Sequence, residues 1–128
     1  MAFGTLKADT LTHSTAGSLD TNFVVNGSAK AWVKFNPSVV VSDSFNNSSV
    51  TDNAVGQFTV ARTNGMNNTG YATQVNGDWT VGTDSGLAIH SVDNTTITGT
   101  QTRCAFYNSS FSQYDVDGMA VTIQGDLA

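Results

Sequence analysis

The stretch that decides the fold covers residues 27–66 and reads GSAKAWVKFN, PSVVVSDSFNNSSVTDN and AVGQFTVARTNGM. Its first part alternates between two kinds of side chain, with Ala29, Ala31, Val33 and Phe35 set against Lys30, Trp32 and Lys34. A period of two residues indicates a strand with two different faces. Farther on, Asp52-Asn53-Ala54 separates residues 48–51 from residues 57–61, and this turn chemistry is typical of a hairpin. We therefore expect short strands that are joined by turns.

The composition favours strands and turns along the whole chain. Its 128 residues include 14 Val, 18 Thr, 13 Ser, 12 Asn and 12 Gly, which are the residue types of strands and turns. All ten acidic residues are Asp, and lysine and leucine occur only three and five times, so strong helix formers are scarce. The composition predicts an all-β protein with very little helix.

Candidate strands recur every 8–12 residues or so, which is the spacing that sandwiches and barrels show. Asn76-Gly77-Asp78 is the most hairpin-like of the turns, because Asn-Gly supplies the positive φ angles that a two-residue turn needs. We predict strands at residues 29–35, 38–41, 49–51, 57–62, 71–75, 79–81, 87–92, 95–98, 102–107 and 119–124. The predicted fold is an antiparallel, jelly-roll-like β-sandwich over residues 29–128, preceded by an N-terminal arm or hairpin over residues 1–28.

Several short motifs follow one another in the stretch from residue 27 to residue 66. They are Ala31-Trp32-Val33-Lys34-Phe35-Asn36, Ser44-Phe45-Asn46, Ser48-Ser49-Val50-Thr51-Asp52-Asn53, Phe58-Thr59-Val60 and Met66. Their order and spacing resemble a module of tail-fibre and other virion surface proteins of marine bacteriophages. The resemblance implies a role in the virion and assembly around a threefold axis.

Large apolar side chains are scarce, and this scarcity bears on the oligomeric state. Leu, Ile, Val and Phe make up 29 of the 128 residues, slightly more than the share of about 20 % below which chains tend to be disordered. A small monomer with so little to bury is marginally stable, so we expect a homotrimer whose subunits complete one another's cores. Trp32, flanked by Lys30 and Lys34, offers a large contact area and cation–π contacts. These three residues and Phe35 are the predicted subunit interface; alternatively, Trp32 caps the sandwich of its own chain.

The first 28 residues differ from the rest, because they are rich in threonine and alternate only weakly. A turn is expected around Ala16-Gly17-Ser18. Such a segment pairs with a neighbouring chain or a docking surface more readily than it folds alone. We interpret it as an attachment arm whose contact residues are Phe3, Leu6 and Leu11. The alternative is that it forms two ordinary edge strands of the same domain.

The charge balance limits the partners. The formal net charge is −5, with only five Lys and Arg, which disfavours nucleic acid and anionic membrane surfaces as partners. The alternative is that the Asp residues serve only solubility. The first residues lack the basic region and following apolar run of a signal peptide, so we do not expect one. No apolar stretch approaches the length of a membrane span. We expect assembly in the host cytoplasm and a final place on the outer surface of the virion, in contact with capsid or other virion proteins.

No pattern in the sequence predicts catalysis, a cofactor or a metal site. The Gly-x-Ser-x-Gly elbow is absent, and His13 and His90 have no spaced set of Cys or acidic ligands. Asp115-Val116-Asp117-Gly118 matches the middle of a calcium loop but lacks acidic ligands at both ends, so a turn before the last strand is expected. Cys104 has no partner for an internal disulfide and is expected to pack as a small hydrophobe. We therefore do not expect an enzyme.

Residues 108–114, NSSFSQY, form the candidate ligand-binding loop. Their amides and hydroxyls match sugar hydroxyls, and their aromatic rings can stack on sugar rings, so Asn108, Phe111 and Tyr114 are the candidate contacts for a host-surface glycan. Ordinary turn composition is the alternative. The predicted function is a structural accessory protein of a phage virion, as capsid decoration, cement or short head fibre. The alternative function is a tail-fibre or tail-tip component that binds host-surface polysaccharide.

Overall fold

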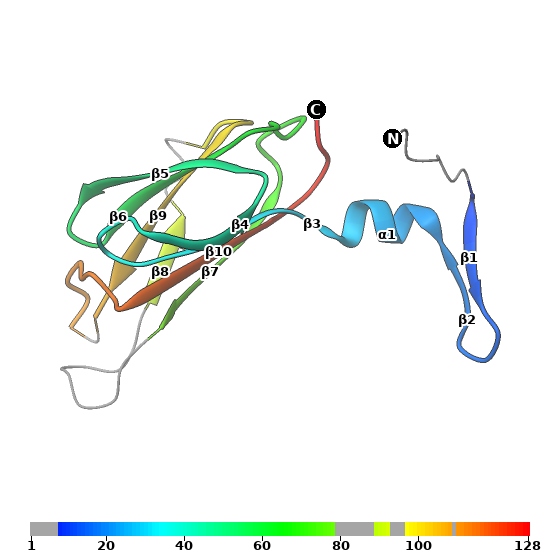
Figure 1. Cartoon of the computed structure of the whole chain (residues 1–128), viewed down its shortest axis with the longest axis horizontal. Helices are drawn as coiled ribbons and strands as arrows, with labels where there is room; N and C mark the ends of the chain where they lie inside the picture. Colours follow the sequence, from blue (N-terminus) through cyan, green and yellow to red (C-terminus); the bar gives the residue numbers. More distant parts are fainter. Residues whose placement is uncertain (1–7, 79–88, 93–96, 109) are drawn as a thin grey trace.

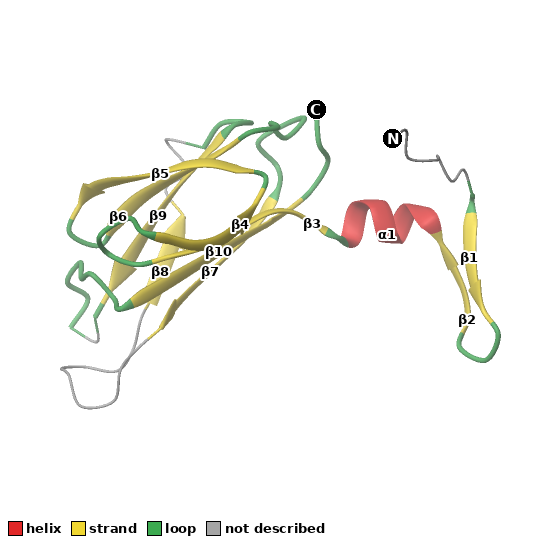
Figure 2. Cartoon of the chain, in the orientation of Figure 1, coloured by secondary structure: helices red, strands yellow, loops and turns green. Residues whose placement is uncertain are grey.

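The computed structural model describes residues 8–78, 89–92, 97–108 and 110–128. Within these residues the chain consists mostly of β-strands, with one short helix, α1 (Figures 1 and 2). The prediction of an all-β protein is thereby confirmed, and all the pairings between the described strands are antiparallel. The strands that form the body are β3 (Ala29–Phe35), β4 (Val41–Phe45), β5 (Asn47–Ala54), β6 (Gln57–Arg62), β7 (Ala72–Asp78), β8 (Ile89–Val92), β9 (Gln101–Tyr107) and β10 (Gly118–Gln124).

A hairpin and the helix precede the body. The hairpin pairs β1 (Thr10–His13) with β2 (Gly17–Asp20), and α1 (Thr21–Gly27) follows at once. The first helical residue, Thr21, is tied back to the chain before β1, because its N–H donates to the Asp9 carbonyl at 2.9 Å and its hydroxyl to the Ala8 carbonyl at 2.7 Å. We call residues 8–28 the arm. Figure 1 shows that the arm extends to one side of the body instead of covering it.

The body consists of two four-stranded sheets, with strand orders β4-β3-β10-β7 and β5-β6-β9-β8. In the first sheet Val33 of β3 pairs with Val121 of β10, which in turn pairs with Val75 of β7. The first and last strands of the body are therefore neighbours. The chain passes from the first sheet to the second at Asn46, whose φ is 53°. Asparagine tolerates this left-handed conformation better than other residues with a β-carbon.

The two sheets share one apolar core. The rings of Phe35 in β3 and Phe58 in β6 meet edge to face with centroids 5.4 Å apart, and Phe58 also contacts the ring of Phe106 in β9 at 6.1 Å. Burying a phenylalanine side chain of this kind stabilises a fold by about 1.5–3 kcal/mol. The buried cluster contains Ala31, Val33, Phe35, Phe58, Val60, Met66, Val75, Cys104, Phe106, Val116, Met119, Val121 and Ile123.

A buried arginine lies at the end of β6. Arg62 is 4 % exposed, and its guanidinium donates at 2.8–3.1 Å to the carbonyls of Thr98 and Gly99 and to the hydroxyls of Tyr71 and Thr102. It also lies over the Tyr71 ring, 4.7 Å from the centroid. All of these partners are neutral, so dipoles and not a carboxylate solvate the charge. Arg62 thereby holds the chain before β9 and the start of β7 against β6.

Two predicted turns differ from the structure. Asn76-Gly77-Asp78 makes no turn, because it lies inside β7 with Gly77 opposite Met119 of β10. The β5–β6 hairpin is present, but its turn lies at Val55-Gly56, after Asp52-Asn53-Ala54, and Gly56 has a φ of 66°. At Asn76-Gly77-Asp78 the long-range pairing with β10, and not the local turn propensity, sets where the strand ends. In the β5–β6 hairpin the turn forms at Gly56, because glycine adopts a positive φ without a steric penalty.

Three further predictions differ from the structure of the described residues. The strand expected at residues 38–41 begins only at Val41, as β4, and the arm contains a helix that the sequence did not predict. The strand expected at residues 79–81 lies outside the described residues, as do residues 87–88 and 95–96 of the strands expected at 87–92 and 95–98. Ile97 and Thr98 are described and are not in a strand.

Candidate functional site

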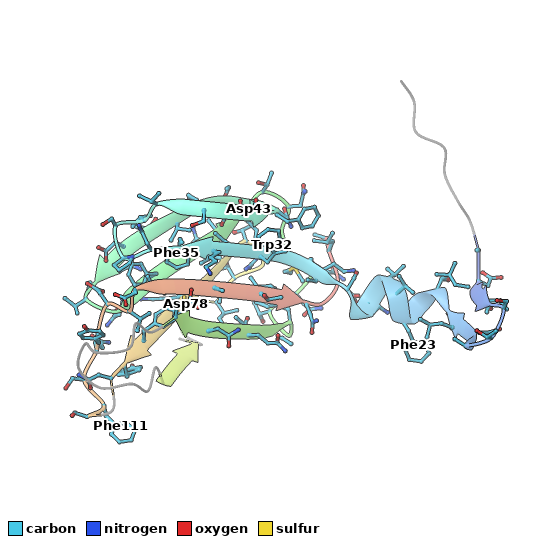
Figure 3. All side chains as sticks on the ribbon, turned by 60° about the horizontal axis from the view of Figure 1, so that its bottom comes forward. Phe23, Trp32, Phe35, Asp43, Asp78 and Phe111 are labelled. Atoms are coloured by element: carbon cyan, nitrogen blue, oxygen red, sulfur yellow. The ribbon has the colours of Figure 1, made fainter. Side chains whose placement is uncertain are left out.

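The outer face of the β4-β3-β10-β7 sheet carries two of the four residues that were predicted for the interface, Trp32 and Lys34. Because Ala31 and Val33 point into the core, the alternate positions Trp32 and Lys34 point outward. The register places Trp32 opposite Phe45 and Lys34 opposite Asp43 on the neighbouring strand β4. Figure 3 shows this sheet with its side chains. We define the outer face by Trp32, Lys34, Asp43, Phe45 and Asp78.

The central feature of the outer face is an exposed aromatic pair. Trp32 is 36 % and Phe45 is 56 % exposed, and they are direct cross-strand neighbours. Side chains at such positions have β-carbons about 4.5–5.5 Å apart, so the two residues are adjacent on the outer face. Phe45 was missed by sequence reasoning, although it lies within the Ser44-Phe45-Asn46 motif. Its face becomes known only when the register against Trp32 is known.

Charged side chains lie beside this aromatic pair. Lys34 Nζ forms an ion pair with Asp78 Oδ2 at 2.9 Å, and both side chains are more than half exposed. An exposed pair of this kind contributes about 0–1 kcal/mol to stability. With Asp43 opposite Lys34, the outer face has two carboxylates for one ammonium group. It therefore offers aromatic contact area within a weakly acidic surrounding.

Two predicted interface residues are not available on the outer face. Phe35 is 1 % exposed and belongs to the core of its own chain, where it contacts Phe58. Lys30 is buried as well, and its ammonium group donates to the carbonyl of Val25 in α1 and to the hydroxyl of Ser28 at 2.9 Å. These placements correct the prediction for both residues. Lys30 connects the arm to the body, since a cation at the C-terminal end of a helix also interacts favourably with the helix carbonyls.

The arm carries a second exposed apolar surface. Leu11 of β1 and Leu19 of β2 face each other across the hairpin, and both are exposed. They line an open hollow of about 470 Å³ together with Thr12, Ala16, Gly17 and Ser18. Of the predicted contact residues of the arm, Leu11 is therefore placed at a surface, whereas Phe3 and Leu6 lie outside the described residues.

The helix extends the apolar surface of the arm toward the body. Phe23 is 68 % exposed, and Val24 and Val25 are exposed as well. We define the arm surface by Leu11, Leu19, Phe23, Val24 and Val25. A seven-residue helix with two adjacent valines has little helical stability of its own. The sequence signals for the helix are Asp20 before it, Thr21 at its start and Gly27 at its end, which are typical of helix boundaries.

The predicted ligand residues lie together in a third place, the loop between β9 and β10. Phe111 and Tyr114 are exposed there, and Asn108 is half-buried. Asp115, next to them, accepts a hydrogen bond at 2.6 Å from the N–H of Gly56 in the β5–β6 turn. This carboxylate therefore has a structural role between two loops.

We also searched the described residues for a metal site, a reactive cysteine and a membrane-spanning helix. There, no three His, Cys, Asp or Glu side chains are grouped so that they could hold a metal ion. Burial raises the pKa of the Cys104 thiol from 9.0 to about 12, so at neutral pH it is a protonated core residue and not a nucleophile. No helix of the described residues is long and apolar enough to cross a membrane.

We compared the chain with protein-family models, with curated proteins and with solved structures, and found no match in any of the three.

Proposed function

We propose that this chain is a structural accessory protein on the outside of a bacteriophage virion, as capsid decoration, cement or a short head fibre. The observation that carries the proposal is the arm surface, where five apolar side chains are exposed on a hairpin and helix that extend away from the body. The body has its own core, whereas the arm has none. The motifs in residues 27–66 resemble those of phage virion surface proteins, and for this reason we propose a phage virion as the particle. The arm docks on the shell, and the body remains outside it.

The proposed architecture of the body is a jelly-roll-like β-sandwich. The pairing of β3 with β10 and of β6 with β9 is nested, as in a long hairpin. β10 also pairs with β7, whereas the pairs β3–β4, β5–β6 and β8–β9 are hairpins between consecutive strands. Jelly rolls likewise divide antiparallel strands between two packed sheets. The shared core between the two sheets also supports this architecture.

The proposed assembly is a homotrimer that forms through the outer face. Trp32 and Phe45 supply apolar area of the kind that dominates subunit interfaces. A threefold ring uses a head-to-tail contact, in which the outer face of one subunit packs against a different surface of the next. Three arms on one trimer then bind the shell together, so weak single contacts give a firm attachment.

Light scattering on the purified protein tests the assembly. The wild type is expected to have the mass of a trimer at micromolar concentration. The double variant Trp32→Ser with Phe45→Ser is expected to be monomeric. Val40→Ser serves as the matched control, since Val40 is exposed but lies off the outer face. A monomeric wild type, or a double variant that remains trimeric, contradicts the proposed interface.

Binding to emptied capsids tests the attachment. The wild type is expected to co-sediment with the shells, and the double variant Phe23→Ser with Val25→Ser is expected to remain in the supernatant. The number of copies per purified particle separates the two virion roles, with hundreds expected for decoration and a few dozen or fewer for a tail fibre. Binding that is unaffected by the arm variants would show that the arm is not the attachment site.

A further inference from the structure

The loop between β9 and β10 lies at the end of the body that is opposite to the arm. Figure 3 places Phe111 at one end of the molecule and Phe23 of α1 at the other. The two features therefore do not compete for space. A partner that holds the arm leaves Phe111 and its neighbours accessible.

Hydrogen bonds fix the shape of this loop. The Asn108 side-chain oxygen accepts from the N–H groups of Ser110 and Ser112, both at 3.0 Å. The backbone closes the same turn, because Asn108 N–H donates to the Ser112 carbonyl at 2.9 Å and Phe111 N–H to the Asn108 carbonyl at 3.0 Å. Tyr114 N–H then donates to the Phe106 carbonyl at 3.1 Å and returns the chain to β9. The loop is thus built around the Asn108 side chain.

Phe111 is held in an unfavourable state by this turn. Its φ is 59°, a left-handed conformation that is uncommon for a bulky residue. Its side chain is 75 % exposed, the largest exposure of any large apolar residue among those the structure describes. Neither the backbone conformation nor the exposure stabilises the fold, and strained residues of this kind concentrate at binding sites. A hydrogen-bonded loop that presents an aromatic ring to solvent is organised for binding before a ligand arrives.

The surroundings of Phe111 restrict the ligand. Tyr114 is exposed nearby, and the side chains of Ser110, Ser112 and Gln113 are exposed as well. Phe111 and Tyr114 are the exposed large apolar side chains in the described part of residues 108–118, and two such rings bury about 150–250 Å² each, which is a small contact area. The only charged side chains in the described part of residues 108–118 are Asp115 and Asp117, and the whole chain is acidic. A small, uncharged ligand fits this combination.

We propose that Phe111 and Tyr114 form a binding site for a neutral hexose polysaccharide. The aromatic rings stack on the apolar faces of the sugar rings, and Ser110, Ser112 and Gln113 exchange hydrogen bonds with the sugar hydroxyls. Rigid aromatics beside Ser, Asn and Gln are the same combination of contact area and adaptable hydrogen bonding that antibody loops use. The site does not depend on which partner the arm takes.

Native electrophoresis in gels that contain dextran, mannan or galactan tests the site. The wild type is expected to be retarded by at least one of these polymers, and Phe111→Ala is expected to weaken the retardation at least tenfold. Phe111→Trp retains binding, whereas Phe111→Leu behaves like the alanine variant if stacking is the interaction. Asn108→Ala keeps the ring but loosens the turn, so it weakens binding as well. Val40→Ala is the matched control and leaves the retardation unchanged.

Several outcomes overturn the proposal. They are the absence of retardation by all three neutral polymers, equal retardation of the wild type and Phe111→Ala, and stronger retardation by dextran sulfate than by dextran. Phe111 is exposed and strained, so its replacement is not expected to unfold the protein. Equal melting temperatures of the wild type and Phe111→Ala confirm that a loss of retardation comes from the lost ring.

Discussion

Replacing Arg62 by methionine removes the buried guanidinium and keeps much of the side-chain volume. Four acceptor groups lose a donor: the carbonyls of Thr98 and Gly99 and the hydroxyls of Tyr71 and Thr102. The acceptors are not left empty, because Gly99 O still accepts from Met66 N–H at 2.7 Å and the Tyr71 hydroxyl remains within reach of Thr98 and Thr102. The loss is therefore that of hydrogen bonds and not of a whole buried network.

The size of the effect follows from this count. A net loss of about 0.5–1.5 kcal/mol for each of four acceptors gives roughly 2–6 kcal/mol. Removing the buried charge recovers part of it, because a cation without a carboxylate partner is costly to desolvate. We expect Arg62→Met to lower the free energy of unfolding by about 3 kcal/mol, or the melting temperature by about 10 °C. Arg62→Lys is expected to cost at least as much, since it keeps the charge and has fewer donors.

Urea unfolding at neutral pH measures this difference. The control is Arg103→Met on the neighbouring strand β9, where the arginine is only half-buried and donates to Gln57 alone among the described contacts. This control is expected to change stability by less than about 1 kcal/mol. If the free energy of unfolding of Arg62→Met lies within about 1 kcal/mol of the wild-type value, the variant behaves like a surface substitution, and the stabilising role of the Arg62 hydrogen bonds is refuted.

Three further predictions concern other parts of the body. Gly56→Ala is expected to lower the free energy of unfolding by more than about 2 kcal/mol, because φ is positive there and the new β-carbon would lie 2.6 Å from Tyr114 N. Gly17 has open space around it, so Gly17→Ala is expected to lower the stability by less in the same melting experiment. Cys104 keeps its proton in the folded state up to about pH 12, while the unfolded chain loses it from about pH 9. The free energy of unfolding therefore falls by about 1.4 kcal/mol per pH unit between these values. A Cys104→Ala variant whose stability falls equally steeply with pH in urea titrations would contradict this. Lys34→Met breaks an exposed ion pair and is expected to shift stability by less than about 1 kcal/mol, which a larger shift in the melting temperature would disprove.

The parts of the fold that the sequence predicted are those in which a local pattern and the long-range structure agree. Ala31, Val33 and Phe35 alternate with Trp32 and Lys34, and the strand that they form is buried on one face as expected. Cys104 packs in the core as a small hydrophobe. Both predictions depend only on side-chain polarity and on the period of a strand.

The errors arise where contacts with other elements override local propensity, or where an element is too short to show its period. Gly77 lies in β7 because β10 pairs along the whole segment, so its turn propensity is not used. Helix α1 is too short to show a helical period, so the sequence pattern predicts an extended arm or hairpin there and no helix. Lys30 shares the alternation of Trp32 and Lys34, but its position beside the end of α1 buries it. Phe45 could not be predicted as the neighbour of Trp32, because this depends on the register between β3 and β4, which the sequence of one strand does not reveal.

The nested pairing of the body has a consequence for synthesis. β3 is the first body strand to leave the ribosome, yet its hydrogen-bonding partner β10 is the last, so the core cannot close until nearly all of the body has been made. Contacts of such large sequence separation make folding slow. During this delay the apolar faces of β3 and α1 are both exposed to solvent, so a nascent chain has to be kept from aggregating with its neighbours until folding is complete.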